Sequence, residues 1–178
     1  DLSGAAYGSA GERCMALPVV VPVGKKTADE LRERMVAEIP SMRVGVSTDA
    51  GAHYGPVVTA QHRDRIAGWI EKGVQEGAEL VVDGRDFSLQ GYEDGFFVGP
   101  SLFDKVTPDM DIYKTEIFGP VLSVASFQDY DDAISIANDT LYGLGAGVWS
   151  RDGNTAYRAG RAIQSGRVWV NQYHNYPA

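Results

Sequence analysis

The hydrophobic positions of this chain follow two different periods, and the change from one to the other predicts its elements. An almost unbroken apolar run from Leu17 to Val23 predicts a buried strand, which ends at Gly24. Apolar residues then recur at helical spacing as far as Ile39, and Thr27 followed by Glu30 has the form of a capping box. The first two elements are therefore expected to be a strand and an amphipathic helix.

The same change of period continues to the end of the chain. After a loop-like stretch over 41–56, the pattern predicts a helix over 59–77, a strand over 78–82, short strands within 91–108 that include 95–100, a strand over 121–127, a helix over 130–138, a strand over 144–150, a helix over 152–164 and a strand over 168–170. Strands that alternate with helices favour an α/β fold, with a mostly parallel sheet and helices on both faces.

Composition and charge narrow the classes of function. The 178 residues are 44% hydrophobic, which suits one globular domain, and the net charge of −8 with scattered basic residues argues against nucleic acid as a partner. No apolar run approaches the about 20 residues that a membrane-spanning helix needs, so no membrane association is expected. The single cysteine excludes an internal disulfide framework and favours a reducing compartment, and we expect a cytoplasmic protein.

Three short stretches hold the residues with chemical potential: 10–15, 114–120 and 138–148. Cys14 lies in the first, and a thiol is the strongest nucleophile among the neutral side chains. A cation such as Arg13 beside it can stabilise the thiolate, although Arg13 could equally point away. A lone cysteine is more often a small buried hydrophobic residue than a nucleophile, so both interpretations of Cys14 stay open on the residues alone.

The order and spacing of these stretches resemble the aldehyde dehydrogenase superfamily. The resemblance is carried by Gly11-Glu12-Arg13-Cys14, by Glu116 to Pro120, by Asn138 to Leu144 and by Gly166 to Asn171, and it covers essentially the whole chain. It implies a single catalytic domain over 1–178, of the catalytic-domain type of that family. Relative to the family, the N-terminal dinucleotide-binding domain and the C-terminal oligomerisation segment are expected to be missing, and the chain to be a piece of a longer protein.

Two subfamilies contribute to the resemblance. Residues 1 to about 120 resemble methylmalonate-semialdehyde dehydrogenases, through 4–15 and 43–49. From about Val121 on, the chain resembles hydrolytic acetaldehyde or aliphatic aldehyde dehydrogenases, through 130–134 and 169–171. A natural mosaic, an engineered chimera and a relative between the two subfamilies all fit this pattern, so the substrate is expected only to be a small aldehyde.

The resemblance also implies a reaction. In the family a thiolate attacks the aldehyde, hydride passes to NAD or NADP, and water or coenzyme A takes the acyl group from the resulting thioester. Cys14 matches the nucleophile, and its backbone N–H is the expected protein half of an oxyanion hole. The family further implies a homo-oligomer for the longer protein.

The same resemblance implies the cofactor-binding residues. Glu116 matches the glutamate that binds the nicotinamide-side ribose, Phe118 matches the aromatic residue beside the nicotinamide, and His62 and Arg65 fall on the helix that borders the cofactor. Without the resemblance, Glu116 would be a solvated carboxylate, Phe118 a core ring, and His62 and Arg65 solvated helix residues. The three histidines lack metal-ligand spacing, and no metal site is expected.

Three functions remain for the isolated chain. The first is the nucleophile-bearing domain of a dehydrogenase, with little dehydrogenase activity by itself. The second is a weak, cofactor-independent thiol esterase. The third is a non-catalytic domain that self-associates through apolar surface.

Overall fold

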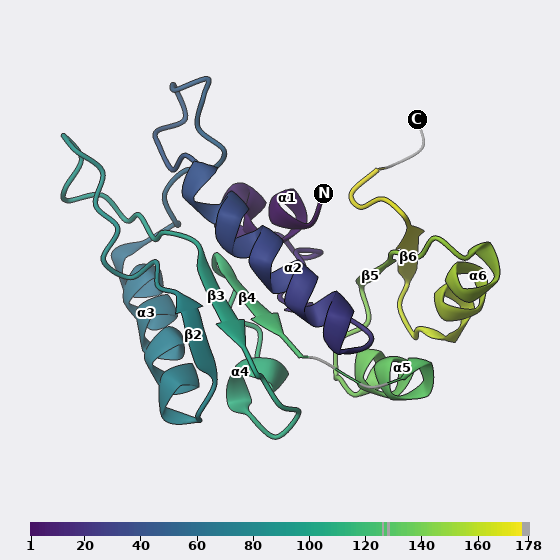
Figure 1. Cartoon of the computed structure of the whole chain (residues 1–178). Coiled ribbons are helices and arrows are strands. Elements are labelled where there is room, and N and C mark those ends of the chain that lie inside the picture. The colour runs from purple at the N-terminus through teal and green to yellow at the C-terminus, as the bar shows by residue number, and fades with distance from the viewer. Residues whose placement is uncertain (126, 128, 176–178) are drawn as a thin grey trace.

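The computed structural model describes residues 1–125, 127 and 129–175 (Figure 1). The helices are α1 (Leu2–Tyr7), η1 (Gly8–Gly11), α2 (Lys25–Glu38), η2 (Ile39–Ser41), α3 (Ala60–Gln75), α4 (Asp111–Lys114), α5 (Tyr130–Asn138) and α6 (Gly153–Ala162). The strands are β1 (Val19–Val20), β2 (Glu79–Val82), β3 (Ser101–Asp104), β4 (Val121–Val124), β5 (Gly145–Val148) and β6 (Arg167–Val170). No helix in the described part is long and apolar enough to cross a membrane.

The strands form two sheets. In the four-stranded sheet the order is β1-β4-β3-β2, with β1 and β3 parallel to β4, while β2 runs antiparallel to β3. Strands β5 and β6 form a separate parallel pair, flanked by α5 and α6 in Figure 1. The predicted α/β class with a mostly parallel sheet is therefore confirmed.

Helices cover both faces of the larger sheet. A Cβ added to Gly73 of α3 would lie 2.8 Å from the Phe103 ring and 2.9 Å from Ile112, so α3 and α4 pack closely against the face to which Phe103 points. The next residue, Asp104, points to the opposite face, because side chains alternate along a strand. There it pairs with Arg32 of α2 at 3.1 Å, and Arg32 also pairs with Glu79 at 2.7 Å.

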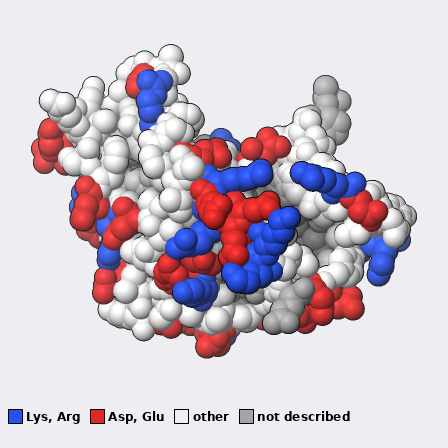
Figure 2. All heavy atoms as spheres, viewed as in Figure 1, with Lys and Arg blue, Asp and Glu red and all other residues white. Residues whose placement is uncertain are grey.

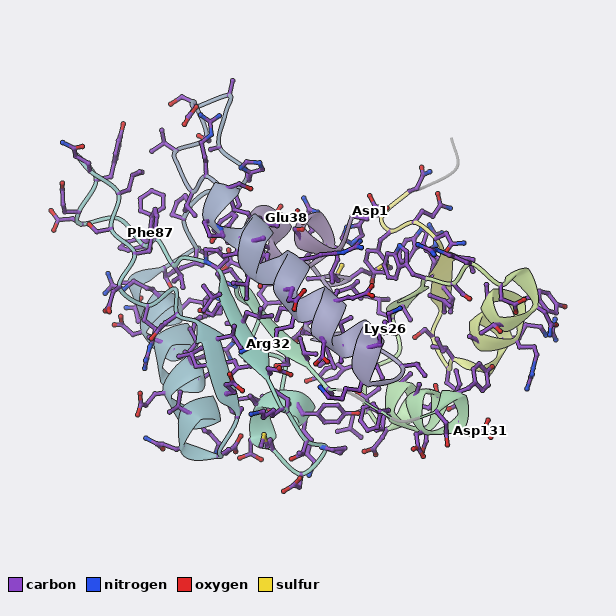
Figure 3. The ribbon with its side chains drawn as sticks, viewed as in Figure 1. Asp1, Lys26, Arg32, Glu38, Phe87 and Asp131 are labelled. Carbon is purple, nitrogen blue, oxygen red and sulfur yellow. The ribbon has the colours of Figure 1, made fainter. Side chains whose placement is uncertain are left out.

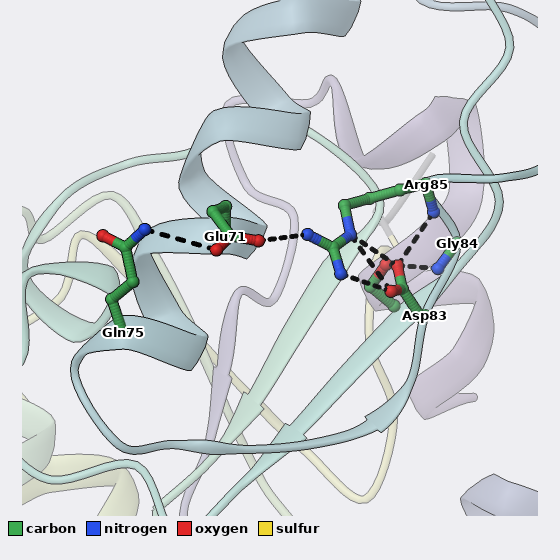
Figure 4. Close-up of polar contacts among 6 residues, drawn as sticks. Glu71, Gln75, Asp83, Gly84 and Arg85 are labelled. Carbon is green, nitrogen blue, oxygen red and sulfur yellow. Dashed lines mark hydrogen bonds and ion pairs between the residues drawn. The ribbon is translucent and has the colours of Figure 1, made fainter.

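On the face shown in Figure 2, acidic and basic residues are mixed, and ion pairs connect different elements of the fold. Acidic and basic side chains are interspersed around α2, from which Lys26, Arg32 and Glu38 project (Figures 2 and 3). On the side of the sheet covered by α3, Arg85 in the loop after β2 donates to Glu71 of α3 and to Asp83 (Figure 4), with closest distances of 2.6 Å to each. These hydrogen bonds from Arg85 hold the pKa values of Glu71 and Asp83 below their usual range.

Several predicted element boundaries were wrong. Thr27 is not the N-cap of α2: the helix begins at Lys25, its N-cap is Gly24 at φ 83°, and no side chain caps it. The strand predicted over 17–23 is reduced to Val19–Val20, because Pro18 and Pro22 lack the N–H that a sheet requires, and only Val23 rejoins the ladder, as a bridge to Phe127.

The strand predicted over 95–100 was also wrong. Those residues form a loop, and β3 starts directly after it, at Ser101. Gly99 lies against Gly84, where its amide donates to the Gly84 carbonyl at 2.9 Å. The predictions for residues 126 and 176–178 lie outside the described residues. Helices α1, η1 and α4 had no prediction, because each is too short to show a period.

Candidate active site

Cys14 lies on an exposed turn between η1 and β1. The preceding helix α1 is anchored by Tyr7, which is fully buried and donates its hydroxyl to the Ser101 carbonyl at 3.1 Å. Within the turn, the Ala16 amide donates to the Arg13 carbonyl at 3.0 Å. Across the described part of the chain, the Cys14 amide has no acceptor, so both its N–H and its thiol are available at the surface.

The segment 11–15, called the Cys14 turn below, touches the segment 116–120 through a backbone contact. A Cβ added to Gly11 would lie 2.1 Å from the carbonyl oxygen of Gly119, and Gly11 has a φ of 69°. Only glycine combines this close approach with a left-handed backbone. The first two stretches that the sequence singled out are therefore in direct contact.

A histidine connects the same two segments to α3. The Nε2 atom of His62 lies 3.2 Å from Oε1 of Glu12 and 2.7 Å from the carbonyl oxygen of Phe118. Both neighbours are hydrogen-bond acceptors, so Nε2 carries the hydrogen. The Glu12 carboxylate is largely buried and also accepts from the Val58 amide at 3.4 Å. Thr59 fixes the start of α3 beneath this contact, since its hydroxyl accepts from the His62 amide at 3.1 Å.

The four residues predicted to bind the cofactor lie together. Arg65, one turn after His62, donates to the Ile117 carbonyl at 2.9 Å. Thus His62 and Arg65 hold two successive carbonyls of the loop that carries Glu116 and Phe118. Phe118 is half-buried with a φ of 58°, and Glu116 is exposed, with no partner for its carboxylate within the residues that the structure describes. The described contacts of His62 and Arg65 go to the protein, whereas Glu116 is available to a ligand.

The segment after β6 reaches the Cys14 turn from the other side. Nε2 of His174 lies 3.0 Å from the Met15 carbonyl oxygen, and its Nδ1 lies 3.5 Å from Nη1 of Arg13. Arg13 also donates to the Ser9 hydroxyl at 3.0 Å, so its guanidinium is directed toward Ser9 and His174 rather than toward Glu12. Sequence reasoning assigned His174 no role, because no spacing in the chain relates it to the turn.

Glycines in β5 make room for this segment. A Cβ on Gly145 would lie 3.3 Å from Met15 and from the Trp169 ring, and a Cβ on Gly147 would lie 2.7 Å from Trp149 and 2.9 Å from Tyr173. The glycine spacing of the third stretch therefore serves aromatic packing next to the Cys14 turn. Asn171 exchanges two hydrogen bonds with the Ser150 backbone, at 2.9 and 3.0 Å.

Backbone strain is concentrated around the turn. Left-handed conformations of residues other than glycine persist only where the surroundings enforce them, and they cluster at functional sites. In the described part of the chain, these residues are Ser9, Ala10, Phe118, Asn171 and His174, which all belong to the segments just described, together with Lys105. The strain identifies the same region as the contacts do.

Comparison with known proteins identifies the same family over the whole chain. The model described as "Aldehyde dehydrogenase family" matches residues 1–178. A malonate-semialdehyde dehydrogenase of Pseudomonas aeruginosa is 49% identical over 170 residues, which are 96% of this chain and 34% of the relative. The acylating methylmalonate-semialdehyde/malonate-semialdehyde dehydrogenase of Bos taurus mitochondria is 43% identical over 96% of this chain and 32% of its own length.

Solved structures agree. A protein of Sinorhizobium meliloti 1021, provisionally described as a methylmalonate-semialdehyde dehydrogenase and solved with NAD, is 53% identical with a TM-score of 0.95, over 99% of this chain and 36% of its own. The likeness to semialdehyde dehydrogenases thus extends past Val121, where the sequence suggested a change of subfamily. The chain spans about a third of the length of the curated relatives that it matches.

Proposed function

The chain belongs to the aldehyde dehydrogenase family, and from this premise we propose that Cys14 is the nucleophile of an aldehyde-oxidising enzyme. The observation that carries the proposal is the exposure of the Cys14 thiol beside a backbone N–H with no acceptor in the described structure. A thiol and an unpaired amide on one turn can attack a carbonyl and stabilise the oxygen that becomes negative.

The proposed chemistry takes place on the sulfur of Cys14. The thiolate adds to the aldehyde carbon, the carbonyl electron pair moves to oxygen, and the Cys14 amide donates to that oxyanion. When the carbon then loses its hydride, the oxygen re-forms a double bond and a thioester remains on the sulfur. Water or coenzyme A attacks the thioester carbon, and the thiolate leaves. One difficult step is thereby divided into two.

Bound NAD(P) would supply the hydride acceptor of this reaction, and the residues around the turn fit it. The Glu116 carboxylate is exposed and has no partner in the described structure, which suits it to accept hydrogen bonds from ribose hydroxyls. The half-buried Phe118 ring offers an apolar surface for the nicotinamide. His62 and Arg65 support both through the carbonyls of Phe118 and Ile117.

We propose a small aldehyde that also bears a carboxylate as the substrate class, because close relatives are malonate-semialdehyde dehydrogenases. Arg13, exposed and adjacent to Cys14, is the cation suited to such a carboxylate. Coenzyme A as the acyl acceptor fits the acylating bovine relative. A cytoplasmic location and a homo-oligomeric longer protein stay predictions.

Acyl transfer from p-nitrophenyl acetate tests the nucleophile without a cofactor. Because the chain has one cysteine, we expect a burst of p-nitrophenolate and one acetyl group on the peptide that contains Cys14. Cys14→Ala should lose both signals. A matched control, Cys14→Ala with Thr48→Cys, places a single thiol on another exposed loop. If that control acylates as fast as the natural chain, the position of Cys14 confers no special reactivity and the proposal fails.

Dehydrogenase turnover by the 178 residues alone is a separate question. We expect little NADH from propanal, because the chain spans about a third of its relatives' length, and a single oxyanion donor is worth on the order of 10²–10³ in rate. Robust NADH formation would contradict this expectation and leave the acylation result unaffected. Slow steady-state ester hydrolysis after the burst would correspond to the esterase alternative.

A second candidate function, self-association, is favoured by exposed apolar residues around the β5–β6 pair. Leu141 is fully exposed, and Tyr142, Leu144 and Trp149 are 54%, 49% and 43% exposed. Clustered apolar surface commonly promotes association. Light scattering across a range of concentrations tests it, and a monomer at high concentration would exclude this candidate.

A further inference from the structure

His174 contacts the Cys14 turn on both sides of the cysteine. Its Nε2 lies 3.0 Å from the carbonyl oxygen of Met15, the residue after Cys14, and its Nδ1 lies 3.5 Å from Nη1 of Arg13, the residue before it. The imidazole comes from the segment after β6, which is far from the turn in sequence.

The two contacts fix which form of the imidazole is compatible with this geometry. A carbonyl oxygen accepts only, so Nε2 must carry a hydrogen, and a guanidinium donates only, so Nδ1 must be the bare acceptor. That combination is the neutral Nε2–H tautomer. If Nδ1 is protonated, two donors and two positive charges face each other, and the contact with Arg13 is lost while the contact with Met15 remains.

The backbone of His174 supports a role beyond surface packing. Its φ of 56° is left-handed, a conformation that costs free energy for a residue with a side chain. Its ring centroid lies 4.6 Å from that of Tyr173 and 5.9 Å from that of Trp169, to which it is nearly perpendicular, and the Tyr173 and Trp169 rings lie 4.5 Å from each other. Trp169 is buried, and its indole N–H donates to the Asn175 carbonyl at 2.8 Å, which holds the segment on both sides of His174.

The charges that face His174 come from three elements. An open hollow of about 410 Å³ is lined by His174 and Arg13 together with Asp1 and Glu38. The Arg13 guanidinium is a positive charge there, and Asp1 and Glu38 bring carboxylates, of which that of Glu38 already accepts the Ser3 hydroxyl. Other titratable groups at or near the turn in the described structure are the Cys14 thiol, the α-amino group of Asp1, Glu12, which pairs with His62, and the Tyr173 hydroxyl.

We infer that His174 is a positioning residue for Cys14, acting through Arg13 and Met15, and that only its neutral form holds both. This role rests on the proposed function of Cys14. In this role His174 holds the turn from the segment after β6, as His62 holds it from α3, where Nε2 of His62 binds Glu12 and the Phe118 carbonyl. The Cys14 turn would then be held from its two ends by two imidazoles.

Amide hydrogen exchange of Ala16 in the 178-residue chain reports how firmly the turn is held, because that amide donates to the carbonyl of Arg13. We expect His174→Ala to accelerate exchange at Ala16 about two- to tenfold, the equivalent of one hydrogen bond. His174→Gln, whose amide can still donate to Met15, should stay within about twofold of the natural chain. His53→Ala is the matched control, because the His53 ring also hydrogen-bonds to the backbone, as acceptor of the Arg43 amide, but far from the turn in sequence.

The pH profile separates positioning from general destabilisation. In the natural chain, Ala16 exchange corrected for its intrinsic rate should rise over the acidic pH range in which the imidazole of His174 becomes protonated, because the contact with Arg13 is then lost. The rate of Cys14 alkylation by iodoacetamide should show a second inflection in the same range. Both effects should disappear in His174→Gln. Equal profiles in the two proteins would overturn the inference, and so would unchanged Ala16 exchange in His174→Ala.

The two proposals fail in different ways. If Ala16 responds as expected but p-nitrophenyl acetate does not acylate Cys14, the proposed nucleophile is wrong and the contact is structural. If Cys14 acylates and Ala16 exchange is independent of His174, only the positioning role is wrong.

Discussion

Replacing Gly11 by alanine tests whether the close approach between Gly11 and Gly119 fixes the Cys14 turn. The new Cβ would lie 2.1 Å from the Gly119 carbonyl oxygen and 2.5 Å from its carbon, which are backbone atoms that cannot rotate away. Gly11 also has a φ of 69°. A left-handed residue with a side chain costs about 1–2 kcal/mol, and overpacking costs about 1–3 kcal/mol. The sum of about 2–5 kcal/mol is a large share of a typical stability.

Alanine substitutions at two other glycines separate the cost of backbone strain from the cost of a steric clash. Gly77 has a φ of 94° with nothing within 4 Å of an added Cβ, so Gly77→Ala should show the strain alone, about 1–2 kcal/mol. Gly4 has neither strain nor a neighbour within 4 Å, and Gly4→Ala in α1 should be neutral or stabilising, by up to about 1 kcal/mol. Urea unfolding of the three variants gives the free energies. If Gly11→Ala loses no more stability than Gly77→Ala, the contact with Gly119 does not constrain the turn.

Three further predictions concern the supports of the fold. Thr59→Ala should cost about 1 kcal/mol in urea unfolding, because the His62 amide loses its cap, and Thr59→Ser should restore it. Burial raises the pKa of Tyr113 to about 12. The free energy of unfolding should therefore decline as pH rises from 10 through 12, because the unfolded chain ionises this tyrosine first. Tyr113→Phe should make this decline less steep. Arg85 lowers the pKa values of Glu71 and Asp83. The two carboxylates therefore stabilise the fold at pH values above the ordinary carboxyl range, and this stabilisation is lost as pH falls through the lowered pKa values. Arg85→Leu should make the unfolding midpoint less dependent on pH in acid.

The sequence predicted a helix well where a capping residue stands directly before apolar residues at helical spacing. The predicted helix over 130–138 is the observed α5, and Asp129 caps it by accepting from the Asp132 amide at 3.0 Å. Thr59 likewise marks the observed start of α3. Both signals act within a few residues, so a single sequence contains them. The capping-box pattern at Thr27 failed because Gly24, bonded through its amide to the Phe127 carbonyl, starts α2 earlier.

Strand directions and site contacts depend on residues far apart in sequence. The antiparallel pairing of β2 with β3 follows a loop in which Gly99 packs on Gly84, and no local pattern encodes that approach. Family resemblance singled out Cys14, Glu116 and Phe118, because their motifs are short and ordered. It could not show that His62 holds Glu12, or that His174 reaches Met15, because these contacts join distant segments.

The position of Cys14 is therefore a property of the tertiary structure rather than of the Cys14 turn. The turn touches Gly119 through its backbone, His62 through Glu12, and His174 through Arg13 and Met15. None of these partners lies within the turn, and each comes from a different part of the chain. A peptide with only residues 8–17 would keep the cysteine and its arginine but lose all three supports, so its thiol should react like that of a free cysteine. Any difference in acylation between that peptide and the folded chain then measures what the three supports contribute.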